Sequence, residues 1–521
     1  MSAAAGPLFA GSGHPAVTSR RIHDTATTAA FALAAIGAAL AVAIALPKPN
    51  LPLTLGVIVM LLFIVWLAVS PKIEWTVTAL VIFLGCLNGP TKLVANAGAL
   101  SSGVQDVLVL AVTLGLIVRT IAKRTPVSMP PLVGWVIAWI VFVLIEAFNP
   151  NTVGILKTLA GYRQQLQWVP FFWFGYLLIR TPQRFKRAFW LLGVIALLNA
   201  FASTGQTQLS PEEVASLGSG YSARVNGPAA RTYGSGGEGH VRPLGLGSDS
   251  GFSGGIGMIA LPGCLALVAL SKRRRERWAA LILTLGCLAG VITGLGRLQV
   301  GGTIIALGAF VGYSFLAGRR ISKPILALLG AVAIALPVGV VFVEAVGSGV
   351  FSRYTSIQPE RFAGTAGSYK FGEIEAIPKY IAAQPFGFGL GTAGAVSGFG
   401  GKQKELFEGH NIPADTEYNF LVKELGIFGL AIWLGFLIRL IVLAATHLRR
   451  VVHPELQILL IAIASPLVAA FFMALDGPVS AGVAGGAYFW FAGGVMSYWF
   501  LGKGRRLASQ PQAAPGTLVA A

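Results

Sequence analysis

The sequence has few charged residues and little cysteine. Aspartate, glutamate, lysine and arginine make up 11% of its 521 residues, and hydrophobic residues make up 55%. Soluble domains carry roughly 25% charged residues, so the composition indicates a polytopic membrane protein. The three cysteines, Cys86, Cys264 and Cys287, all lie in apolar segments. That position argues against a disulfide framework and against a thiolate metal site.

Acidic residues are scarce as well, which leaves a formal net charge of +19. Such a charge is typical of nucleic-acid-binding proteins. Here, however, the basic residues fall in short clusters between apolar segments instead of along one polar face. We therefore expect membrane lipids, and no nucleic acid, among the partners of this protein.

Apolar segments long enough to cross a bilayer recur along the chain. A transmembrane helix needs about 20 such residues, and this criterion predicts about 14 spans. The spans cover residues 26–46, 51–70, 75–91, 104–121, 130–148, 164–181, 187–204, 251–271, 277–296, 299–317, 323–345, 417–446, 455–475 and 481–502. The sixth is expected to begin with an interfacial piece. The predicted fold is an all-α polytopic membrane protein.

Basic clusters mark every second boundary between these spans, and the positive-inside rule makes that side cytoplasmic. Both termini then lie in the cytoplasm, and two long loops lie outside it. The predicted regions are a disordered N-terminus (1–25), N-terminal transmembrane helices (26–204), a first extracytoplasmic loop (205–250), central transmembrane helices (251–345), a large extracytoplasmic loop (346–416), C-terminal transmembrane helices (417–502) and a disordered tail (503–521).

Polar residues gather on the predicted outer side. The first loop carries Arg242, the tight turn Gly294-Leu-Gly-Arg297 joins two spans, and the second loop carries His410. Guanidinium groups grip phosphate oxygens bidentately, so arginines at a lipid boundary suit a pyrophosphate whose lipid tail stays in the bilayer. Arg297 could also be a snorkelling anchor, and Arg242 a solvated loop charge. His410 could be a general base or a structural loop histidine.

Four segments on this side follow one another over residues 242–429. They are Arg242-Pro-Leu-Gly-Leu-Gly-Ser-Asp249, Gly294-Leu-Gly-Arg297, Ile381-Ala-Ala-Gln-Pro-Phe-Gly-Phe-Gly-Leu-Gly-Thr392, and His410-Asn411 followed by Tyr418, Leu421, Glu424, Gly426 and Gly429. In the same order, they resemble motifs of the O-antigen ligase/polymerase superfamily of bacterial envelope glycan enzymes. In the first segment, Ser248-Asp249 stands where that family usually has Pro-Asn.

The resemblance implies a GT-C-like glycosyltransferase of the bacterial cytoplasmic membrane. Its two outer loops would form a cap, and its active site would face away from the cytoplasm. Such enzymes transfer a glycan from undecaprenyl pyrophosphate to an acceptor hydroxyl on another glycan or lipid, with inversion. Arg242 and Arg297 would bind the pyrophosphate, and His410 would remove the acceptor proton. Pyrophosphate is a good leaving group, so neither a divalent metal nor another cofactor is expected.

Further candidates for substrate binding come from the outer loops and from the segments beside them. Arg163, in Gly161-Tyr-Arg-Gln-Gln-Leu-Gln167, could bind a lipid phosphate, and Asp415 could orient the His410 imidazole. Glu424 could pair with Lys423 or Arg297, and a structural pairing is the more common role for such a residue. The full set of substrate-binding candidates is Arg163, Arg353, Arg361, Asp415, Tyr418 and Glu424.

Three functions remain open. A polymerase would join two lipid-linked repeats, and the stretch Asp415-Thr-Glu-Tyr418 slightly favours it. A ligase would move the glycan to a lipid or protein acceptor. A lipid-linked oligosaccharide flippase or secondary transporter would place its charges near the bilayer midplane and often shows internal repeats. The span interiors are nearly free of charge and no repeat is visible, which favours an enzyme.

Overall fold

The structure is a computed structural model. It describes residues 51–70, 72–94, 98–122, 129–152, 154–210, 232–233, 240–247, 250–319, 371–393, 416–475, 477–480 and 482–509, with the single residues 213 and 330. The chain divides into two compact units. The smaller consists of Met1–Val77 with Leu110–Pro126, and the larger of Thr78–Val109 with Val127–Ala521. Every site discussed below lies in the larger unit.

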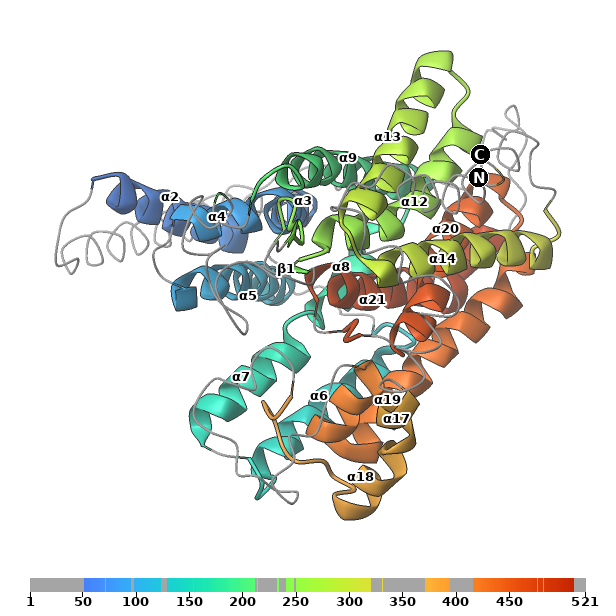
Figure 1. Ribbon diagram of the computed structural model, residues 1–521. Coiled ribbons are helices and arrows are strands. Elements are labelled where there is room, and N and C mark those ends of the chain that lie inside the picture. Colours follow the sequence, from blue (N-terminus) through green and yellow to red (C-terminus); the bar gives the residue numbers. More distant parts are fainter. Residues whose placement is uncertain are drawn as a thin grey trace, which may run out of the picture. The chain divides into compact units, whose positions relative to one another are not determined.

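Helices dominate the described residues (Figure 1). A two-stranded antiparallel ladder of β1 (Thr232–Tyr233) and β2 (His240–Val241) precedes α12, and π-helical turns η1 (Phe83–Leu87) and η7 (Ser497–Leu501) follow α3 and α21. The α-helices are α2 (Leu51–Val69), α3 (Ile73–Ile82), α4 (Asn88–Val94), α5 (Gly98–Ala122), α6 (Val133–Ile145), α7 (Ile155–Leu166), α8 (Pro170–Leu178), α9 (Pro182–Gln206), α12 (Phe252–Leu270), α13 (Arg274–Thr293), α14 (Arg297–Leu316), α17 (Phe371–Glu375), α18 (Ile377–Ala383), α19 (Glu417–His447), α20 (Pro454–Met473), α21 (Val483–Met496) and α22 (Gly504–Ser509).

Eight helical segments of the described residues are long and apolar enough to cross a membrane, and the predicted all-α polytopic membrane fold is confirmed. Shorter apolar helices lie at Ile58–Val69 and Val133–Phe148. The predicted spans at 26–46 and 323–345 fall outside the described residues, apart from residue 330. The long segments are Ile73–Thr91, Gly103–Ile121, Pro182–Gln206, Phe252–Leu270, Arg274–Thr293, Arg297–Leu316, Glu417–Arg450 and Pro454–Met473.

The predicted sixth span, 164–181, does not form one helix. Helix α7 ends at Leu166 and α8 begins at Pro170. Proline has no N–H and clashes with the preceding helical turn, so it fits the start of a helix and interrupts a continuous one. Helix α8 has nine residues, which gives it a length of about 14 Å. That is about half of the hydrocarbon core of a bilayer.

The basic clusters of the larger unit lie together at one end of its helices. The Nζ atom of Lys186 at the start of α9 lies 2.9 Å from Glu455 Oε1 at the start of α20. Arg319, after α14, donates to the Pro454 carbonyl over 2.6 Å. The loop after α19 pairs with α22, because Val452 N–H donates to the Ala508 carbonyl over 2.9 Å. We call this the basic end.

At the opposite end lie the starts of α12, α14, α19 and α21 and the end of α20. The Glu417 N–H donates to the Ala474 carbonyl over 2.9 Å, which joins the start of α19 to the end of α20. Gly302, near the start of α14, lies against Met473. Small residues permit such close helix contacts in membrane proteins. This second end carries the residues that the sequence singled out.

Candidate functional site

The arginine turn, Gly294–Arg297, joins α13 to α14 through three residues, as the sequence predicts. Leu295 has φ +51°, and it is the one non-glycine residue with a positive φ among the described residues. Its side chain is completely buried. A left-handed backbone costs a leucine about 1–2 kcal/mol, and strain of this kind concentrates at functional sites.

Arg242 and Arg297 lie at the N-terminal ends of two neighbouring helices. Gly251 is the N-cap of α12, and Arg297 is the first residue of α14. A β-carbon at Gly251 would lie 3.1 Å from Gln299 Nε2 and 3.9 Å from Arg242 Nη2, so Arg242 lies beside the start of both helices. Helix N-termini present unpaired N–H groups and a partial positive charge. Together with two guanidinium groups they favour an anion.

The loop that carries Arg242 is held on two sides. Gln206 Oε1, at the end of α9, accepts hydrogen bonds from the N–H groups of Leu244 (2.9 Å) and Gly245 (2.8 Å). Asn199 Oδ1 accepts from the Leu246 N–H over 2.8 Å. On the other side, the Gly89 N–H of α4 donates to the Leu246 carbonyl over 2.9 Å. These bonds fix the loop close to α4 and α9.

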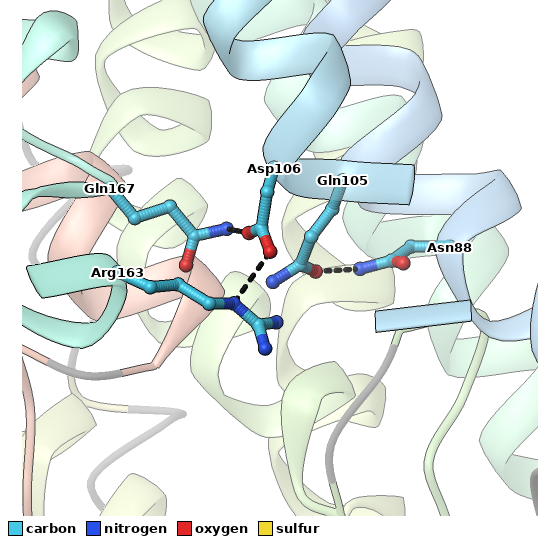
Figure 2. A network of polar contacts seen from close by, with 5 residues as sticks. All are labelled: Asn88, Gln105, Asp106, Arg163 and Gln167. Atoms are coloured by element: carbon cyan, nitrogen blue, oxygen red, sulfur yellow. Dashed lines mark hydrogen bonds and ion pairs between the residues drawn. The ribbon is translucent and has the colours of Figure 1, made fainter. Parts of the chain in front are cut away.

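A network of five polar side chains borders this loop through Asn88, the neighbour of Gly89 (Figure 2). Arg163 Nε of α7 lies 2.5 Å from Asp106 Oδ2 of α5, and Gln167 also donates to the Asp106 carboxylate. Asn88 Nδ2 of α4 donates to Gln105 Oε1 of α5 over 2.8 Å. Asn88 is buried, whereas the Arg163 side chain is 35% exposed. The predicted phosphate ligand Arg163 is thus ion-paired and still reaches the surface.

The Glu424 pocket is a second polar cluster, and it is closed to solvent. Glu424 is completely buried. Its carboxylate accepts hydrogen bonds from Gln165 Nε2 (2.6 Å), Gln164 Nε2 (3.2 Å) and the Ala393 N–H (3.2 Å). Its hydrogen-bond partners therefore include two glutamines of α7, which the sequence did not suggest. Burial lowers the pKa of the neighbouring Lys157, and the Glu424 charge opposes that shift.

The glycine-rich element of the second loop packs directly on this pocket. Gly387, Gly389 and Gly391 all have positive φ, and a β-carbon at Gly391 would lie 2.7 Å from the Lys157 carbonyl oxygen. Helix α19 is interrupted nearby at Gly426, with φ +62° and ψ −161°. There the Ile427 N–H donates to the Pro385 carbonyl over 3.0 Å. The glycines allow two backbones to approach where side chains would collide.

The start of α19 is tied to its neighbours by side chains. Glu417 is buried and accepts hydrogen bonds from the N–H groups of Val479 (2.5 Å) and Ser480 (3.0 Å). The Tyr418 hydroxyl donates to the Phe471 carbonyl over 2.9 Å. Asn419 donates to Glu373 of α17 over 3.2 Å. These contacts fix the residues that follow the predicted His410 motif in the sequence.

The structure brings together some of the predicted site residues. Arg242 and Arg297 share one end of the helices. Arg163 belongs to the network whose Asn88 lies next to the Arg242 loop, whereas Tyr418 and Glu424 are hydrogen-bonded inside the protein. Asp106 was missed, although an acidic residue in the apolar segment 104–121 is a recognisable signal. No known protein family matches this chain, and no curated protein is similar to it. The candidates outside the described residues are Arg353, Arg361, His410 and Asp415.

Proposed function

We propose that this protein is a membrane glycosyltransferase that uses an undecaprenyl-pyrophosphate-linked glycan as donor. The observation that carries the proposal is the position of Arg242 beside Gly251 and Gln299, where α12 and α14 begin, with Arg297 as the first residue of α14. Two permanent positive charges and two helix ends complement the two phosphates of a pyrophosphate.

The position of the arginine turn suits a donor with a lipid tail. Ile292, just before the turn, and Ile304, two helical turns after it, are 36% and 53% exposed. Exposed apolar residues on helices of this kind face lipid. A lipid-linked pyrophosphate can therefore reach Arg297 while its hydrocarbon chain stays in the bilayer.

In the proposed reaction the acceptor hydroxyl oxygen forms a bond to the anomeric carbon of the glycan. The bond between that carbon and the pyrophosphate oxygen breaks, and undecaprenyl pyrophosphate leaves. His410 takes the hydroxyl proton, and attack opposite the leaving group inverts the anomeric centre. Arg242 and Arg297 stabilise the negative charge that develops on the leaving group. No step requires a metal.

The test uses purified protein in nanodiscs with lipid-linked oligosaccharide supplied alone. Undecaprenyl pyrophosphate release and the product ladder are measured. We expect His410→Ala to lower the turnover rate by about 10²–10⁴-fold with the donor still bound. Arg297→Ala should weaken donor binding by roughly tenfold or more, and Arg297→Lys should restore it only in part, because lysine lacks the bidentate fork.

Arg505→Ala is the matched control, because Arg505 is an exposed arginine at the basic end. It should change neither rate nor binding. A ladder from donor alone identifies a polymerase, and release only after a separate acceptor is added identifies a ligase. Donor binding without release under both conditions would contradict the proposal and point to a flippase or transporter.

A further inference from the structure

A cavity of about 290 Å³ opens at the basic end, far from the arginine turn along the helices. It lies between the start of α9, the end of α12 and the start of α13. The wall on α9 carries cations and an indole, and the wall on α12 is apolar. Its lining includes Lys186, Arg187, Trp190, Leu267, Leu270 and Glu276.

The surroundings of the cavity are strongly cationic. Lys186 is paired with Glu455, and Arg277 Nη2 donates to the Ser271 carbonyl over 3.1 Å. Glu276 is the acidic residue among those that line the cavity. The complementary ligand is therefore an anion. Further cations near the cavity in sequence are Arg184, Lys272, Arg273, Arg274 and Arg275.

An apolar stripe continues from the cavity along α9. Val194, Leu198 and Phe201 follow Arg187 and Trp190 at helical spacings of three and four residues, so they share one face. They are 43%, 44% and 68% exposed. Helix α13 runs beside α9, since Gly286 lies against the Leu197 side chain, and its exposed residues include Trp278 and Ile282. Such a surface fits an acyl chain below an anionic head.

We propose that this cavity binds an anionic phospholipid. The lipid phosphate lies against Arg187 beside Lys186, the Trp190 ring lies at the level of the headgroup, and one acyl chain follows the exposed stripe of α9. Basic pockets between transmembrane helices are typical sites for anionic headgroups, and tryptophan is enriched at the membrane interface. The site is separate from the arginine turn, so it does not depend on the proposed glycan transfer.

The test measures which lipid the protein retains. Full-length protein is reconstituted in nanodiscs of phosphatidylglycerol and phosphatidylcholine in equal parts, extracted, and examined by native mass spectrometry. Wild-type protein should retain phosphatidylglycerol in preference to phosphatidylcholine. Arg187→Gln should lower the retained phosphatidylglycerol roughly tenfold, because a charge-assisted contact to the phosphate is lost. Arg187→Lys should keep most of it, since a positive charge remains.

Arg505→Gln is the control, because Arg505 is exposed at the same end but does not line the cavity. Retention by Arg505→Gln should equal that of wild type, and the unfolding temperatures of all variants should agree. Equal losses in Arg187→Gln and Arg505→Gln would mean general surface attraction and would overturn the proposal. So would the absence of a lipid preference in wild type, or displacement of the lipid by soluble glycerol phosphate, which would identify a site for free phosphate.

Discussion

The Glu424 pocket and the arginine turn each hold a charged group among apolar helices, but the first buries that group and the second leaves it partly exposed. Glu424 is completely buried, and two glutamines and a backbone N–H bond its carboxylate. Arg297 is only partly buried, and it begins a helix whose N-terminus favours an anion. A buried carboxylate surrounded by hydrogen-bond donors stabilises one arrangement of the chain, whereas a partly exposed charge at a helix start lies where a ligand can reach it. The first cluster is therefore structural, and the second is the better candidate for binding.

Replacing Glu424 should give the largest loss of stability. Glu424→Ala removes the acceptor of Gln165 Nε2 and of the Ala393 N–H and one of the two acceptors of Gln164 Nε2. It also removes the charge that compensates Lys157. Breaking a buried charge network of this kind costs about 3–5 kcal/mol. The free energy of unfolding in detergent should fall by that amount.

Arg297→Ala and Glu276→Ala serve as its controls. Arg297 is partly exposed and Glu276 is exposed, and each substitution should change the free energy of unfolding by about 0.5 kcal/mol or less. If Arg297→Ala destabilises the protein as much as Glu424→Ala does, the contrast between the two regions disappears.

Gly426→Ala should give the next largest effect. Its φ of +62° with ψ −161° suits glycine alone, and a β-carbon would lie 2.1 Å from the Pro385 carbonyl oxygen. The backbone strain alone costs about 1–3 kcal/mol, and the collision adds to it. Gly308→Ala is the matched control, because that helical glycine has open space around it. Alanine there should stabilise α14 by about 0.5–1 kcal/mol. Equal unfolding temperatures for the two variants would refute the proposed role of Gly426.

Substitutions in the Asp106–Arg163 pair should lower the free energy of unfolding less than Gly426→Ala does, by about 1 kcal/mol or less, because the pair is partly exposed. These substitutions test whether the network is structural, like the Glu424 pocket, or binds a ligand, as proposed for the arginine turn. If Arg163 binds the donor phosphate, Arg163→Gln should weaken donor binding, and Asp106→Asn should strengthen it by releasing the guanidinium group. Donor affinity is measured in nanodiscs for both variants. If Arg163→Gln and Asp106→Asn weaken donor binding equally, the network is structural, like the Glu424 pocket.

Local features of the sequence predicted most of the fold. Runs of about 20 apolar residues gave helices close to the predicted bounds, for example α12 and α20. The sequence predicted an interfacial piece at the start of the sixth span but not the break between α7 and α8, because the apolar residues after Pro170 extend the hydropathy signal across it. A hydropathy window averages over a helix and does not register a single interruption.

The sequence by itself determined the class of this protein, the positions of most helices and the tight turn that ends in Arg297. Each follows from residues that are close together in the chain. The tertiary structure alone decided that Glu424 bonds to Gln165, 259 residues away, and that Arg163 pairs with Asp106. It also decided that Arg242 lies beside the start of α14. Such pairs form because packed helices bury polar groups side by side, and a buried polar group needs a hydrogen-bond or charge partner. Composition and residue spacing do not specify which residue that partner is.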